Sequence, residues 1–316
     1  MSGLGHFVGL TAPLFLLVLF GYALTTFARW PPAATDALTR FVFTVAVPTL
    51  LFRLMSDFGR LPRVDARLLI AFFGGCLVVY VVGRVVGASL FRMDGVSQAV
   101  FAMGGIFSNL VLLGIPIAKV TLGEAALPAV SLVVVFNSLV LWTLVTISVE
   151  WARHRDLSPR SLLKTARGVI TNPIVASILA GTAFGFLGVP LPTIVDDTLA
   201  MIGQAAVPLS LIALGMGLTE FGIRAEWRPS FAITVLKLVG QPAAVFGIAH
   251  ILGLPPLETT VVVMLAALPI GANVYLMSRQ FGVLSGATAA AIVLTTAVAA
   301  LSMPVILTLL GSGGAH

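Results

Sequence analysis

Two short stretches of the sequence place asparagine, glycine and proline in the middle of long apolar runs. Residues 109–116 read Asn-Leu-Val-Leu-Leu-Gly-Ile-Pro, and residues 267–273 read Ala-Leu-Pro-Ile-Gly-Ala-Asn. Proline removes a backbone donor and clashes with the preceding turn, so neither run can form one unbroken helix. In lipid, non-helical backbone persists only where protein or a water-filled cavity satisfies its polar groups. Interrupted segments in matching halves of a membrane chain therefore indicate a transporter's binding site.

The residue types in these stretches suit the binding of an anion. Each interruption creates a new helix start, whose free N–H groups and dipole favour negative charge. Pro116 and Pro269 suit the first position of such a helix, because the N–H that proline lacks is not needed there. Gly114 and Gly271 give the chain freedom to turn and let a ligand approach the backbone.

Asn109 and Asn273 add a side-chain amide to each stretch. An amide can donate to a carboxylate, or it can only cap the free backbone groups at the break. Because polar groups at membrane depth are costly without a use, substrate contact is favoured for at least one of the two. The predicted substrate-binding residues are Asn109, Gly114, Pro116, Pro269, Gly271 and Asn273.

Charged side chains largely avoid the apolar runs. All twelve Asp and Glu residues fall in loops or at helix ends, whereas cation carriers usually keep a carboxylate inside the membrane. This placement argues against a cation as the substrate. Lys237 is expected deep in a run, where it compensates the charge of the substrate, stands in for a coupling cation, or extends to the inner interface along its stem.

Pro48 and Pro208 lie inside two further runs, each within the triplet Ala-Val-Pro. Proline kinks helices, and the repetition suggests two matching helices that face the interruptions. Simple bending and contact with the substrate both remain open for this pair.

The composition is that of a polytopic membrane protein. Hydrophobic residues make up 59% of the 316 residues and charged residues 9%, with a mean hydropathy of +1.09, whereas a soluble domain carries about 25% charged residues. The net charge of +6 comes from Lys and Arg in loops, which fits lipid headgroups and topology rather than nucleic acid. A single cysteine, Cys76, and four scattered histidines indicate no disulfide, metal site or cofactor. The first run has no basic segment before it, so we expect a membrane-spanning helix rather than a cleaved signal peptide.

Ten apolar runs approach the roughly 20 residues that a membrane-spanning helix needs. They lie near residues 8–28, 37–56, 67–91, 96–122, 127–150, 169–188, 194–218, 229–252, 258–281 and 285–310. The fourth and ninth contain the interruptions. The largest polar interval, residues 151–168, is expected to form a short cytoplasmic loop.

The two halves repeat at an offset of 160 residues. The repeated segments are Thr11-Ala12-Pro13 with Thr171-Asn172-Pro173, Gly21 and Ala23 with Gly181 and Ala183, and Ala46-Val47-Pro48 with Ala206-Val207-Pro208. Because each half holds five runs, the second half must enter the membrane in the opposite sense. We predict an all-α protein of ten transmembrane helices in two inverted five-helix repeats, residues 1–150 and 169–316, in which the broken helices 4 and 9 cross.

The distribution of Lys and Arg predicts the orientation. With the N-terminus outside, twelve of them face the cytoplasm and five face the outer side, as the positive-inside rule requires. The even number of helices then places both termini outside the cytoplasm, in the plasma (cell inner) membrane.

Four segments resemble the auxin efflux carrier family, which includes plant PIN carriers and bacterial malonate-type transporters. Residues 40–52, with Arg-Phe-Val followed by Ala-Val-Pro, resemble the second helix of plant members. Residues 109–116 resemble their Asn-Thr-Leu-Val-Met-Gly-Ile-Pro stretch, and Lys237 with Pro242 is similar to an Arg five residues before a Pro. Residues 266–271 match Ala-Ala-Leu-Pro-x-Gly, and Asn273 matches the bacterial form.

The resemblance covers nearly the whole chain and implies a bile-acid-symporter-like fold. It implies a scaffold of helices 1, 2, 6 and 7, which also forms the surface of a homodimer, and a transport part made of the other six. An elevator-type movement would carry a carboxylate held where helices 4 and 9 cross. The expected partners are this substrate, membrane lipid and a second copy of the chain.

Two departures from plant members favour a short mono- or dicarboxylate, such as malonate, over an indole acid. Leu51 stands where plant carriers have a Ser associated with the auxin carboxylate, and their long cytoplasmic loop is reduced to residues 151–168. The alternatives are a sodium-coupled organic-anion symporter of the bile-acid type, an auxin-like indole acid carrier, a membrane-embedded enzyme and a channel. An enzyme would need a base, nucleophile or metal, and no His, Asp or Glu cluster lies inside a run.

Overall fold

The computed structural model describes residues 3–56, 64–154, 173–219, 226–271 and 273–312. Within these ranges the protein is helical and contains no strand. Six helices are long and apolar enough to cross a membrane, so the chain is a multi-pass membrane protein. Most of the predicted loop 151–168 lies outside the described residues. Its first four residues belong instead to a helix that continues to His154.

Every predicted run contains helical segments in its described part, and the fourth and ninth runs also contain the non-helical residues 105–109 and 267–271. In the first half they are α1 (Gly3–Thr26), α2 (Pro32–Phe41), η1 (Val42–Ala46), α3 (Val47–Ser56), α4 (Arg67–Ser89), α5 (Gly95–Gly104), η3 (Leu110–Gly114), α6 (Ile115–Leu122), η4 (Glu124–Ala126) and α7 (Leu127–His154). In the second half they are α9 (Pro173–Phe186), α10 (Thr193–Gln204), α11 (Ala206–Leu218), α12 (Trp227–Val235), η5 (Leu236–Gly240), α13 (Gln241–Ile251), α14 (Pro256–Ala266), α15 (Asn273–Phe281) and α16 (Ser285–Ser312).

Three prolines inside helical segments are each preceded by one widened, π-helical turn. The turns η1, η3 and η5 end two residues before Pro48, Pro116 and Pro242, respectively. A proline ring clashes with the carbonyl one turn earlier, and a π-turn is one of the ways in which a helix accommodates such a defect. At Pro48 the helix therefore departs locally from α-helical geometry. Its counterpart Pro208 lies in the first turn of α11, after a break at Ala205.

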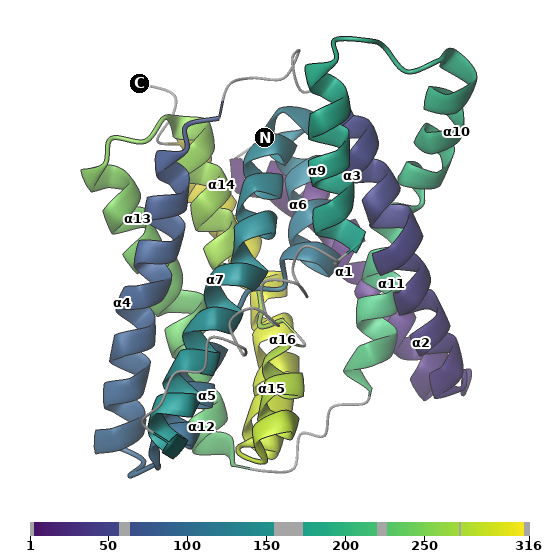
Figure 1. Ribbon diagram of the computed structural model, residues 1–316. Coiled ribbons are helices and arrows are strands. Elements are labelled where there is room, and N and C mark those ends of the chain that lie inside the picture. Colours follow the sequence, from purple (N-terminus) through teal and green to yellow (C-terminus); the bar gives the residue numbers. More distant parts are fainter. Residues whose placement is uncertain (1–2, 57–63, 155–172, 220–225, 272, 313–316) are drawn as a thin grey trace.

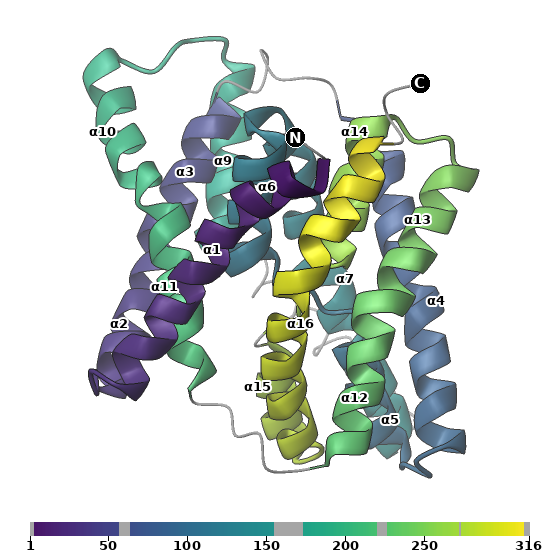
Figure 2. The same cartoon turned by 180° about the vertical axis from the view of Figure 1, so that it is seen from behind.

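The helices form two groups that lie side by side in both views (Figures 1 and 2). One group contains α1, α2, α3, α9, α10 and α11, and the other contains α4, α5, α7 and α12–α16. The short helix α6 contacts α1 and α11 of the first group and α7 of the second. The helix α1 begins and α16 ends at the same end of the molecule (Figure 2).

Glycines allow very close helix packing in the first group. A Cβ atom on Gly21 of α1 would overlap the backbone oxygen of Ile212 on α11, and one on Gly181 of α9 would lie 2.5 Å from the backbone oxygen of Phe52 on α3. Gly181 lies 160 residues after Gly21, and Phe52 lies 160 residues before Ile212, so both members of the pair differ by the offset of the sequence repeat. The first helix of each half therefore packs on the second helix of the other half through the same two positions.

We expect Gly21→Ala to destabilise the protein by about 1–3 kcal/mol, because an added methyl group forces two close backbones apart. The measurement is the thermal unfolding midpoint of the purified protein in detergent. Gly9→Ala is the matched control, since Gly9 lies on the same helix and a Cβ there meets no atom within 4 Å. Equal midpoints for the two variants would contradict the packing described above.

Candidate functional site

The two helix breaks pair with each other through their backbones. Residues 105–109 follow α5, and residues 267–271 follow α14. The Asn109 N–H donates to the Pro269 carbonyl at 2.9 Å, and the Gly271 N–H donates to the Phe107 carbonyl at 2.9 Å. Ser108 faces Ile270 in an antiparallel arrangement. The breaks thus satisfy one another's polar groups, which membrane-buried backbone requires.

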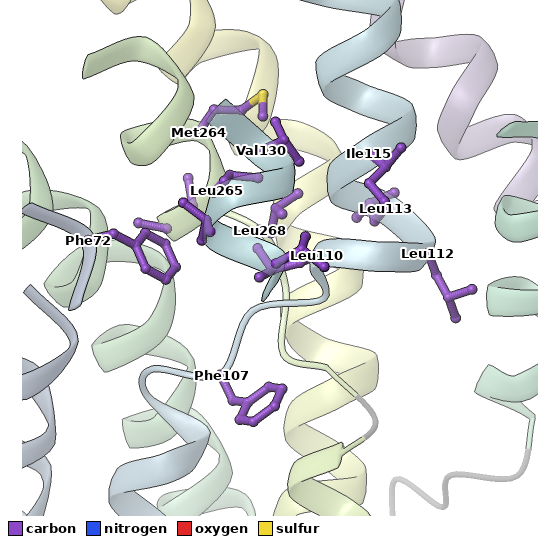
Figure 3. Packing of buried hydrophobic residues seen from close by; sticks show 14 of the residues in the cluster. Phe72, Phe107, Leu110, Leu112, Leu113, Ile115, Val130, Met264, Leu265 and Leu268 are labelled. Carbon is purple, nitrogen blue, oxygen red and sulfur yellow. The ribbon is translucent and has the colours of Figure 1, made fainter. Parts of the chain in front are cut away.

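Side chains complete the packing around this pair. Leu110, Leu112 and Leu268 all belong to the buried hydrophobic cluster around the breaks (Figure 3). From α16, the Thr295 hydroxyl accepts the Ile270 N–H at 3.2 Å. The second break is therefore bonded to α16 as well as to the first break.

Only one of the two prolines of the site lies at a helix start, where their residue type predicts them. Pro116 is the second residue of α6, but the π-turn η3 leads directly into α6, so the helical segment as a whole starts at Leu110. Pro269 lies in the non-helical segment before α15, where its carbonyl accepts from Asn109. At the first break the helical segment can begin several residues before its proline, because the π-turn accommodates the proline ring within a helix.

The glycines of the site provide close approach rather than freedom to turn. Gly114 has helical dihedral angles, φ −64° and ψ −50°, and Gly271 is not among the described residues with positive φ. A Cβ on Gly114 would lie 2.8 Å from a methyl carbon of Leu268, and one on Gly271 would lie 3.2 Å from the Ser108 carbonyl oxygen. Each glycine thus allows one break to contact the other.

The two asparagines lie at the starts of the helices that follow the breaks. Asn109 immediately precedes η3 and is 7% exposed, and its side chain does not cap that helix. Asn273 is the first residue of α15 and is partly exposed. The Asn109 amide therefore sits beside the free N–H groups of a helix start without being used to close them.

Lys237 lies between the two breaks, completely buried. Its Nζ donates to the Ala266 carbonyl at 2.6 Å, to Gln241 Oε1 at 2.6 Å and to Ser108 Oγ at 3.0 Å. Extension of this side chain to the inner interface, one of the possibilities left open above, is therefore wrong for this structure. Burial of a charge is costly unless it is well bonded, and these three bonds match the three donors of an ammonium group.

Several polar residues of this region were not predicted from the sequence. Gln241 Nε2 donates to the Ile106 carbonyl at 2.9 Å and to Cys76 Sγ at 3.2 Å, so it holds Lys237 against α4 and the first break. On α7, which packs against η3, Asn137 is 4% exposed and its Oδ1 has no partner among the described residues. The sequence alone could have indicated Asn137 as a candidate functional residue, because it places an amide in the middle of an apolar run.

Comparison with known proteins defines the class. A family model described as membrane transport protein matches residues 6–307. The "Putative malonate transporter" of Rhizobium meliloti (strain 1021) is 27% identical over 98% of both chains. Auxin efflux carrier component 8 of Arabidopsis thaliana is 21% identical over 87% of this chain and 89% of its own, and an uncharacterized transporter of Methanocaldococcus jannaschii is 23% identical over 80% and 82%.

The chain is therefore a membrane transporter. It belongs to the auxin efflux carrier family of membrane transport proteins, whose model covers nearly its whole length.

Proposed function

We propose that the protein is a secondary active transporter of a small organic anion, a mono- or dicarboxylate such as malonate. The observation that carries this proposal is the pairing of two helix starts, each with an asparagine, at one place in the protein. Helix starts favour negative charge, and an amide is a good donor to a carboxylate. The relative named as a malonate transporter supports the same class of substrate.

The charge of Lys237 supports an anion further. All three of its hydrogen-bond acceptors are neutral groups, and one of them belongs to Ser108, the neighbour of Asn109. A carboxylate bound at the breaks would supply the negative charge that this lysine lacks. The substrate-binding set that we propose is Asn109, Gly114, Pro116, Pro269, Gly271 and Asn273, with Lys237 compensating charge.

We also propose that the fold consists of ten transmembrane helices in two inverted five-helix repeats, with crossing helices 4 and 9. The related contacts of Gly21 with Ile212 and of Gly181 with Phe52 support this symmetry. An inverted pair of five-helix units also agrees with the start of α1 and the end of α16 at one end of the molecule. Both termini would then lie outside the cytoplasm, as the Lys and Arg count suggests.

The two groups of helices suggest how the substrate would cross the membrane. The breaks, Lys237 and α16 all belong to the second group, which would move as one body against the first in an elevator-type movement. The first group would form the scaffold and the surface of a homodimer. The hydrogen bonds between the two breaks would then stay formed during this movement.

The proposed function is tested by uptake into proteoliposomes of a radiolabelled panel of malonate, malate, lactate and indole acetate, with and without imposed proton and sodium gradients. We expect saturable uptake of a short carboxylate. Uptake of indole acetate alone would favour an auxin-like carrier, and strict sodium dependence would favour a symporter of the bile-acid type. If none of the acids enters under any gradient, the proposal is wrong.

A further inference from the structure

The hydrogen bonds of Lys237 allow two protonation states. The Ala266 carbonyl and Gln241 Oε1 can only accept, so Nζ must donate to both at 2.6 Å. Ser108 Oγ, at 3.0 Å, is a hydroxyl and can either accept or donate. An ammonium group donates to all three partners. A neutral amine donates to the two carbonyl oxygens and accepts the Ser108 proton, so no hydrogen bond is lost when the proton leaves.

We propose that Lys237 is the site at which this transporter binds a proton together with its anion. The inference rests on the proposed function and names the proton as the ion that is coupled to anion transport at the same site. With a carboxylate at the breaks, the ammonium form is stabilised by the nearby negative charge. In the empty carrier no such charge is present, and the cost of burying an unpaired cation favours the amine.

The other groups around Lys237 leave it without a permanent partner of opposite charge. The turn η5 packs against α4, α12, α13 and α16. From α4 the nearest titratable group is the Cys76 thiol, which Gln241 contacts. Arg228 lies nine residues before Lys237 on α12, and His250 lies thirteen residues after it on α13. The described part of α16 carries no titratable side chain, and on α14 Glu258 lies eight residues before Ala266.

The proton balance of the step is simple. On loading, one proton from water adds to the Nζ lone pair, the Ser108 hydroxyl rotates from donor to acceptor, and the anion binds. On release, the anion leaves, Nζ returns the proton to water on the other side, and the hydroxyl rotates back. One proton thus travels with each anion, and by thermodynamic reciprocity the proton and the anion strengthen each other's binding.

The chain offers a direct test that leaves Lys237 unchanged. It contains three lysines, Lys119, Lys164 and Lys237, so isotope labelling of lysine Nζ gives three NMR signals. Lys119→Arg and Lys164→Arg assign two of them, and the third belongs to Lys237. The signal is recorded on the full-length protein at about pH 8, above the ordinary range of malonate ionisation, with and without malonate. Proton uptake from a weakly buffered solution is measured in the same titration.

We expect malonate to raise the ratio of ammonium to amine at Lys237 by about tenfold, within the usual range of coupling between two sites. We also expect net uptake of protons, approaching one proton for each malonate bound where the empty carrier holds the amine. A Lys237 signal that stays ammonium, or stays amine, with and without bound malonate would overturn the proposal.

The transport panel described above distinguishes a failure of the proposed function from a failure of this inference alone. If no acid is transported, the proposed function fails and this inference falls with it. If malonate is transported without a change at Lys237, only the inference fails.

Discussion

Asn109→Asp is expected to reduce carboxylate uptake by roughly a hundredfold or more. The substitution keeps the shape of the side chain but places a negative charge where the anion is proposed to bind. Two like charges about 4 Å apart repel by about 4 kcal/mol at the effective dielectric of a protein site. The measurement is the initial rate of malonate uptake into proteoliposomes. Uptake should recover in part as the pH is lowered, because protonation removes the new charge.

The fold should tolerate this change, which makes the result clear to interpret. A carboxylate just before a helix is favourable, because it faces the positive end of the helix dipole. The thermal midpoint is therefore expected to stay close to that of the wild type. Asn109→Ser is the neutral control and should retain much more uptake than the aspartate variant. If both variants transport equally, Asn109 lies away from the anion.

Lys237→Met is expected to abolish transport and to cost about 2–5 kcal/mol of stability, because it leaves buried acceptors unpaired. The variant removes the group that joins Ser108 in the first break to Ala266 at the second. Methionine fills a similar volume without a polar end, so the effect reports the lost bonds rather than a cavity. Thermal midpoint and uptake are measured on the same preparation.

Lys119→Met is the matched control for this experiment. Lys119 is a partly exposed residue near the end of α6, and its Nζ lies 3.7 Å from a carboxylate oxygen of Glu124, which is itself exposed. Exposed ion pairs contribute little to stability, so this variant should unfold and transport like the wild type. A Lys237→Met protein as stable and active as this control would show that the lysine does not hold the breaks together.

The sequence was sufficient to predict an interruption in each of the two runs, because Gly and Pro within an apolar run both disfavour a continuous helix. It misplaced the first interruption, since the non-helical residues 105–109 come before the helical residues 110–116. It also revealed the offset of 160 residues, which recurs in the packing of Gly21 and Gly181. The starts of the helices were not predictable in this way. Whether a helix begins at Pro116 or six residues earlier depends on a π-turn, and the turn is set by packing rather than by residue type.

The partners of Lys237 were also beyond a reading of the sequence. Its position in an apolar run indicated a buried charge, but Ser108, Gln241 and Ala266 come from three different segments. Only the tertiary fold brings these atoms together. The close packing of Gly114 and Gly271 against the other break was not predicted for the same reason.

The pairing of the breaks has a consequence for the biosynthesis of the protein. Residues 105–109 leave the ribosome long before residues 269–271, which provide their hydrogen-bond partners. Until then the Asn109 N–H and the Phe107 carbonyl lack the partners that the second half provides, and an unpaired backbone group in the membrane costs several kcal/mol. The two halves therefore cannot mature one after the other as finished units. A nascent chain that stops before residue 269 would remain a substrate for membrane quality control.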